Sequence, residues 1–192
     1  MFLKLYHRRE IFGQENFQSE GKGVIVASNH ASFLDPIAAG SAFPQHIWYL
    51  ARTTLYNNKF LGWWMSNVNV VPISRERLDM RTIRKVKSLC EEGQSVLIFP
   101  EGTRSKNGQL QKGLAGIGLF IDKIGADVLP VYSDTYNAFP RHAKFPRPVK
   151  VKNYIGKIIK SEKWKDIPSG REKYQKIADD IMEEIAKLKK GF

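Results

Sequence analysis

Short apolar runs alternate with longer amphipathic stretches along this chain, and this alternation limits the fold more than any other feature. The short runs are rich in β-branched residues and bounded by turn-forming residues, so each predicts a strand. They are residues 24–28, 47–51, 68–73, 95–99 and 128–132. The alternation of strands and helices with short connections predicts an α/β fold, in which helices flank both faces of a mainly parallel central sheet.

The stretches between these runs carry helix signals. Asp35 followed by Pro36 predicts an N-cap and a proline at the first helical position. A second helix ends at Gly93, and a third, over residues 113–124, ends at Gly125. The second has one apolar face, made of Ile83, Val86, Leu89 and Cys90.

The last third of the chain has a looser pattern. Residues 149–159 predict one more strand, and apolar side chains at helical spacing over residues 174–188 predict a closing amphipathic helix. The sequence contains neither an internal repeat nor a domain linker. We therefore expect a single domain over residues 1–192, with residues 1–17 as a membrane-proximal segment.

Composition agrees with one globular domain. The chain has 192 residues, of which 42% are hydrophobic, enough for a core of its own. Its single cysteine, Cys90, rules out an intrachain disulfide and is predicted to be a buried structural thiol. The sequence shows neither a spanning run of roughly 20 apolar residues nor a signal-peptide pattern. We expect a protein that is not integral to a membrane but can lie on one.

The charge is strongly positive, with a formal net charge of +12. Of the 31 Lys and Arg residues, 15 lie in residues 141–190, beside 7 acidic residues. A basic surface attracts polyanions, and composition alone does not separate anionic lipid, an acidic carrier protein and nucleic acid. A solvated basic face without a dedicated partner is the remaining alternative.

The first chemical motif is Asn-His-Ala-Ser-Phe-Leu-Asp, residues 29–35, directly after a predicted strand. Ligands bind at such strand ends in open α/β sheets. His30 and Asp35 can meet if the strand turns into a helix between them, and the carboxylate then fixes the imidazole tautomer. Because the chain lacks a Gly-x-Ser-x-Gly nucleophile motif, this dyad would deprotonate a substrate hydroxyl, which indicates acyl transfer to an alcohol. The alternatives are a chance spacing, a plain helix cap at Asp35, and Ser32 as nucleophile.

The second motif is Phe-Pro-Glu-Gly-Thr-Arg-Ser, residues 99–105, also at a strand end. Gly102 permits a tight turn near a ligand, and Arg104 offers a planar fork suited to phosphate. Thr103 offers a hydroxyl, and Glu101 can accept hydrogen bonds from substrate hydroxyls. An ordinary polar turn with an exposed arginine is the alternative.

Together, these motifs resemble those of the glycerolipid acyltransferases typified by 1-acyl-sn-glycerol-3-phosphate acyltransferase. Two further family-like blocks follow in the expected order, Val-Pro-Ile-Ser-Arg at 71–75 and Val-Leu-Pro-Val at 128–131. Tyr-Leu-Ala-Arg at 49–52 resembles the segment in which the family usually carries a lysine. The resemblance covers residues 21–132 and implies a glycerol-phosphate acyltransferase-like fold.

The resemblance implies transfer of a fatty acyl group from acyl-carrier protein (acyl-ACP) or acyl-CoA to 1-acyl-glycerol-3-phosphate (lysophosphatidic acid), giving phosphatidic acid. His30 would be the general base and Asp35 its orienting partner. Substrate binding is implied for Arg52, Arg75, Glu101, Gly102, Thr103 and Arg104. The arginines would hold the acceptor phosphate, and the other three would shape the glycerol pocket. No metal or cofactor beyond the thioester co-substrate is implied, and the enzyme would be peripheral on the cytoplasmic side of the cell membrane.

Several positions depart from the family pattern. Arg52 replaces the usual lysine and is followed by two threonines, which keeps a cation but changes its reach. Asn69 stands where glycine is common, and Leu110-Gln111 replaces a frequent Phe-Lys pair, which leaves the details of the acceptor open. The membrane-anchoring helices that often precede the domain would be absent or reduced to the first 17 or so residues.

A dense apolar cluster, residues 60–65, includes Trp63 and Trp64 and follows Lys59. It predicts either contact with an anionic membrane surface or a place in the core or an acyl channel. Other functions stay open: acylation of glycerol-3-phosphate or another lyso-lipid, an inactive lipid binder, or a basic non-catalytic module for membranes or nucleic acid. Because no recognised nucleic-acid motif appears, we expect no nucleic-acid partner.

Overall fold

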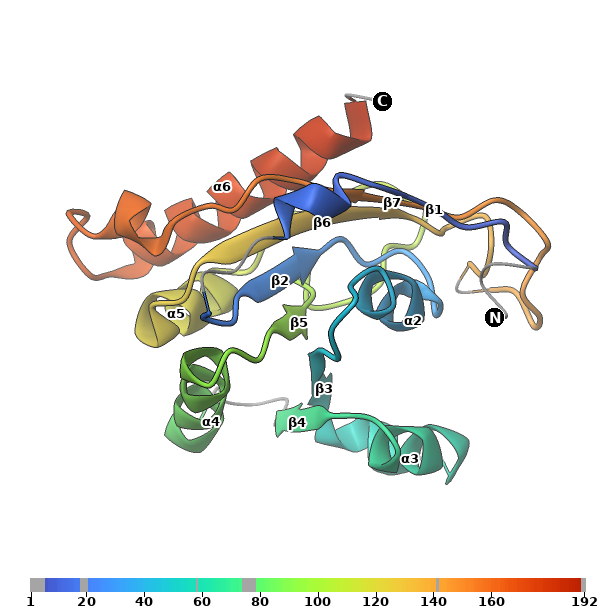
Figure 1. Ribbon diagram of the computed structural model, residues 1–192, viewed down its shortest axis with the longest axis horizontal. Coiled ribbons are helices and arrows are strands. Elements are labelled where there is room, and N and C mark those ends of the chain that lie inside the picture. Colours follow the sequence, from blue (N-terminus) through green and yellow to red (C-terminus); the bar gives the residue numbers. More distant parts are fainter. Residues whose placement is uncertain (1–5, 18–20, 58, 74–78, 141, 191–192) are drawn as a thin grey trace.

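A computed structural model describes residues 6–17, 21–57, 59–73, 79–140 and 142–190. Within them, seven strands form one sheet in the order β1-β7-β6-β2-β5-β3-β4 (Figure 1). The five strands from β6 to β4 are parallel, whereas β7 is antiparallel to β6 and parallel to β1. The strands are β1 (Glu10–Phe12), β2 (Ile25–Ser28), β3 (Trp48–Arg52), β4 (Val70–Ile73), β5 (Val96–Ile98), β6 (Val128–Asp134) and β7 (Lys152–Ile155).

Helices cover both faces of the sheet. Apolar side chains of α2 pack on one face, and those of α4, α5 and α6 pack on the other. The α-helices are α2 (Asp35–Gly40), α3 (Lys59–Ser66), α4 (Met80–Glu91), α5 (Ala115–Ile124) and α6 (Arg171–Lys190). Three short 3-10 helices complete the regular structure: η1 (Gln14–Asn16), η2 (Thr53–Asn57) and η3 (Ser161–Trp164).

The central strand β2 explains why the chain folds around one site. Ile25, Val26 and Ala27 are fully buried, because β2 has a strand on each side and helices above and below. Parallel strands place their carboxyl ends at one edge of the sheet, so the segments that follow β2, β5 and β6 meet there. On the far side, α5 and α6 pack closely: a Cβ at Gly118 would lie 1.8 Å from the carbonyl oxygen of Tyr174.

The predicted α/β architecture is confirmed, with differences in detail. The structure adds β1 and α3, which the sequence pattern did not reveal, and it shortens the strand expected over residues 149–159 to β7. Asp35 is the first residue of α2 and Leu34 is its N-cap, so the predicted capping role of Asp35 was wrong. Cys90 is buried as predicted, and burial raises the pKa of its thiol to about 12. None of the helices in the described ranges is long and apolar enough to cross a bilayer.

Candidate active site

His30 and Asp35 meet at the carboxyl edge of the sheet, where β2 turns into α2. The imidazole Nδ1 lies 2.7 Å from Oδ2 of Asp35. Because an ionised carboxylate only accepts hydrogen bonds, Nδ1 carries the imidazole proton, and Nε2 keeps its lone pair for an incoming hydroxyl. The ring is stacked on Phe99, with ring centroids 4.0 Å apart. The imidazole is 18% exposed, so it is held in place and still open to a ligand.

Asp35 is fully buried, and its carboxylate is satisfied by four donors. Oδ2 accepts hydrogen bonds from the backbone N–H groups of Ala31 and Ser32, at 2.6 and 2.7 Å, besides the bond from His30. Oδ1 accepts one from the hydroxyl of Thr135. A buried carboxylate without such partners would be strongly unfavourable, so these donors are what keep a charge beside His30.

The loop of the second motif, residues 99–105, holds His30 by its backbone. The His30 N–H donates to Oε1 of Glu101 at 3.0 Å, and the His30 carbonyl accepts from the Ser105 N–H at 2.7 Å. The second oxygen of Glu101 accepts from the Gln111 amide at 2.7 Å. Glu101 is 4% exposed, and burial raises the pKa of its carboxyl, while the hydrogen bonds from Gln111 and His30 act in the opposite direction. With both oxygens bound by protein groups, Glu101 holds the backbone of His30 in position.

The other residues of this loop lie next to the dyad. Gly102 has a φ of 66°, a left-handed conformation that favours glycine, and its carbonyl accepts from the Arg52 guanidinium at 2.5 Å. The Arg104 guanidinium stacks over Phe33, with 3.5 Å between Cζ and the ring centroid. Thr103 is exposed. Of the predicted substrate-binding residues, Arg75 alone lies outside the described ranges.

Ser32, the alternative nucleophile, has its hydroxyl committed elsewhere. It is fully buried, donates to the carbonyl of Phe139 at 2.9 Å and accepts from the N–H of Leu34 at 3.1 Å. These contacts fix the turn that brings His30 to Asp35. The described residues contain no group of three His, Cys, Asp or Glu side chains placed to hold a metal ion.

Comparisons with known proteins identify the family to which this chain belongs. The model of the acyltransferase family matches residues 8–134, more than half of the chain. The chain is 34% identical over 128 residues to the chloroplastic 1-acyl-sn-glycerol-3-phosphate acyltransferase BAT2 of Brassica napus, covering 66% of this chain and 37% of that protein. It is 30% identical over 119 residues to the 1-acyl-sn-glycerol-3-phosphate acyltransferase of Bacillus subtilis, covering 61% of this chain and 59% of that one.

A solved structure agrees with these relatives. The 1-acyl-sn-glycerophosphate (LPA) acyltransferase PlsC of Thermotoga maritima superposes with a TM-score of 0.72 at 25% identity, over 94% of this chain and 72% of that chain. The fold is thus that of a glycerolipid-acyltransferase-like α/β protein. The chain belongs to the acyltransferase family, as the sequence motifs predicted. It spans between 36% and 59% of the length of the first three curated relatives.

Three contacts of the site were not foreseen from the sequence. Thr135 lies 100 residues from Asp35 along the chain, and nothing in its surroundings indicates that it binds the carboxylate. Gln111 was recognised only as a departure from the family pattern. Phe99 was considered part of a strand end, although it supports the imidazole ring.

Thr135 gives a direct test of how the carboxylate is held. Thr135→Val keeps the shape of the buried side chain but removes the donor to Asp35, so we expect kcat to fall about tenfold, the equivalent of one lost hydrogen bond in the transition state. KM for either substrate should stay within about twofold, and Thr135→Ser should restore kcat. A Thr135→Val protein with wild-type kcat would show that this hydrogen bond does not support the dyad.

Proposed function

We propose that the chain is an O-acyltransferase that moves a fatty acyl group from a thioester donor to the free hydroxyl of 1-acyl-glycerol-3-phosphate, giving phosphatidic acid. The observation that carries this proposal is the His30–Asp35 pair, with Nδ1 facing the carboxylate and the hydroxyl of Ser32 turned to a backbone carbonyl. Such a site has a base but uses the substrate hydroxyl as its nucleophile. The names of the relatives support the same acceptor.

The reaction follows from this geometry in two proton transfers. Nε2 of His30 takes the proton of the acceptor hydroxyl while its oxygen attacks the thioester carbonyl, and Asp35 stabilises the imidazolium that forms. The tetrahedral intermediate collapses by breaking the carbon–sulfur bond, and the imidazolium returns the proton to the departing thiolate. The products are an ester and a free thiol, and His30 returns to its starting state.

His30 provides the test of this chemistry. Incubation of the protein with lysophosphatidic acid and either acyl-CoA or acyl-ACP should yield phosphatidic acid, followed by mass spectrometry. His30→Ala should lower turnover by at least ~10²-fold, the usual scale for loss of a general base. His46→Ala, which removes an exposed histidine outside the site, is the matched control. A His30→Ala protein with undiminished turnover would contradict the proposal.

The acceptor phosphate is assigned to the arginines on the β5 and β3 side of His30. The Arg52 guanidinium binds the carbonyl of Gly102, and Arg104 follows two residues later in the same loop, stacked over Phe33. A planar guanidinium matches a phosphate in charge and geometry. Arg75 would join them on the basis of the sequence alone. Because Glu101 has both oxygens engaged by the protein, we assign it to positioning, while Thr103 and the backbone of Gly102 line the acceptor side.

Arg104→Ala is expected to raise KM for the phosphate-bearing acceptor more than KM for the acyl donor, because a charge-assisted contact to one substrate is removed. A monoacylglycerol acceptor, which lacks the phosphate, should be affected less. Steady-state kinetics with both acceptors measures the difference. Equal losses for the two acceptors would make Arg104 a structural residue. A wild-type preference for glycerol-3-phosphate over lysophosphatidic acid would favour glycerol-3-phosphate as the acceptor.

The apolar cluster at residues 60–65 divides between surface and core. Trp63 is 65% exposed, whereas Met65 is 3% exposed; the side chains of Phe60, Leu61 and Trp64 lie outside the described part. Most other exposed large apolar side chains of the described residues also lie in segments that follow strands, whereas Tyr6 precedes β1. They are Phe33, Ile37, Leu55, Tyr56, Met80, Leu114 and Phe145. We infer that this edge of the sheet faces an anionic membrane surface, on which the lipid acceptor resides.

Vesicle co-sedimentation tests this orientation. Basic residues act over about a Debye length, so much of the preference for anionic over neutral vesicles should vanish by about 0.5 M salt. Trp63→Ala should lower the fraction that remains bound at high salt and leave the salt-sensitive part unchanged, because its contribution is apolar. If Trp63→Ala binds as the wild type does at every salt concentration, Trp63 does not enter the membrane.

A further inference from the structure

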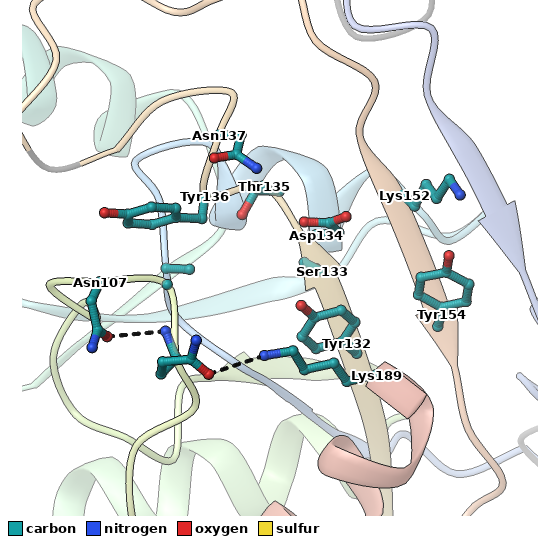
Figure 2. A pocket seen from close by; sticks show the side chains of 13 residues that line it. Asn107, Tyr132, Ser133, Asp134, Thr135, Tyr136, Asn137, Lys152, Tyr154 and Lys189 are labelled. Carbon is teal, nitrogen blue, oxygen red and sulfur yellow. Dashed lines mark hydrogen bonds between the residues drawn. The ribbon is translucent and has the colours of Figure 1, made fainter. Parts of the chain in front are cut away.

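A polar cavity of about 440 Å³ lies next to the dyad, on the face of the sheet that α6 covers. Its walls come from the end of β6, from β7, from the last turn of α6 and from the loop at residues 107–109 (Figure 2). A volume of this size suits a small ligand or one arm of a larger one. None of the catalytic or substrate-binding residues predicted from the two sequence motifs lines this cavity.

The lining of the cavity is suited to a phosphate joined to a chain of amides. Lys189 contributes its ammonium group from the last turn of α6, and Lys152 lines the wall from β7 with its ammonium group turned away from Lys189 (Figure 2). The phenol rings of Tyr132 and Tyr154 stack with centroids 6.2 Å apart. Burial raises the pKa of Tyr132 to about 12, so its hydroxyl stays protonated at neutral pH and can donate. Amide partners are supplied by the side chains of Asn107, Gln109 and Asn137.

The positive charges of the two lysines are not neutralised by salt bridges within the described part of the chain. Among the ion pairs of the described residues none contains Lys152 or Lys189, whereas Lys150 and Lys160 nearby in the sequence both pair with carboxylates. Lys189 lies 3.4 Å from the side-chain oxygen of Gln109, a neutral partner that also lines the cavity. Asp134, opposite Lys152 in the strand register, offsets one of the two positive charges.

The cavity is connected to the dyad by two of its wall residues. Ala31 donates its N–H to Asp35, and Thr135 donates its hydroxyl to the same carboxylate. In the sheet, β6 and β7 lie on one side of β2, and β5 and β3 lie on the other. Arg104 is in the loop that follows β5, and Arg52 is the last residue of β3. Two substrates that each carry a phosphate can therefore reach His30 from opposite sides.

We propose that this cavity binds the phosphorylated pantetheine arm of the acyl donor. The assignment rests on the proposed acyl transfer, which requires a second substrate beside the phosphate-bearing acceptor. The same arm, a phosphate followed by two amides and a thiol, is common to acyl-CoA and acyl-ACP. Lys189 binds its phosphate directly, and Lys152 adds positive charge at the wall of the cavity. The amide side chains of the loop at residues 107–109 and of Asn137 bind its amides.

Kinetics with truncated donors test the assignment. In Lys152→Ala/Lys189→Ala, KM for an acyl-4′-phosphopantetheine donor should rise about tenfold, the scale of one lost charge-assisted contact. KM for acyl-pantetheine, which lacks the phosphate, and KM for lysophosphatidic acid should stay within about twofold. Lys165→Ala, which removes an exposed lysine beyond the opposite end of α6, should match the wild type. Equal losses for both donors, no loss at all, or a rise confined to KM for lysophosphatidic acid would each overturn the assignment.

The two natural donors are then compared in the same double variant. A rise in KM for both acyl-CoA and acyl-ACP supports recognition of the shared arm. A rise in KM for acyl-CoA alone means that the lysines bind the nucleotide, and it contradicts the proposal. If the wild type transfers no acyl group from any donor, the proposed function fails. Calorimetric titration of 4′-phosphopantetheine still tests the cavity in that case: binding to the wild type and weakened binding to the double variant support it, and equal or absent binding overturns it.

Discussion

The site depends on one buried negative charge, the carboxylate of Asp35. Moving a carboxylate out of water is strongly unfavourable unless donors replace the lost hydration. Here the donors come from the turn after β2, through the N–H groups of Ala31 and Ser32, from His30 itself, and from Thr135 after β6. The carboxylate thus ties the first turn of α2 to the segment after the neighbouring strand. Because its acceptor sites are filled, the position of the imidazole is fixed as well.

The two sequence motifs form one structure because β2 and β5 are adjacent parallel strands. Their carboxyl ends lie side by side, so the loop after β5 closes over the backbone of His30 through Glu101 and Ser105. Gln111 completes this brace with a neutral amide, where the family frequently carries a lysine. Glu101 is therefore a buried carboxyl without a cation in direct contact among the hydrogen bonds described, which is consistent with the raised pKa of its carboxyl.

Much of this arrangement was predictable from the sequence, because it depends on local patterns. The strands that became β2 to β6 are short β-branched runs, and Gly125 ends α5 in the left-handed conformation expected of such a residue. The two motifs predicted both the dyad and the family. By contrast, β1 has only three residues, too few to show an alternation of apolar and polar side chains. The run of apolar and aromatic residues in α3 shows no helical spacing, so the helix was not predicted.

What the sequence could not supply were partners distant along the chain. Thr135 reaches Asp35 across 100 residues, and Lys189 reaches the cavity only because α6 packs back across the sheet. The role of Asp35 was predicted only in part: its link to His30 was foreseen, but its carboxylate binds the turn before α2 rather than the first N–H groups of the helix. A carboxylate can accept hydrogen bonds from a helix N-terminus, from a turn or from a histidine, and the sequence alone does not say which of these donors it binds.

The central claim is that Asp35 holds His30 as the tautomer with its proton on Nδ1 and its lone pair on Nε2. Nitrogen-15 NMR of histidine-labelled protein measures this directly, with the His30 signals assigned by their loss in His30→Gln. At neutral pH the account predicts that neutral His30 carries its proton on Nδ1 in the wild type and that this preference is lost in Asp35→Asn. A neutral His30 protonated on Nε2 in the wild type, or a tautomer unaffected by Asp35→Asn, would contradict it.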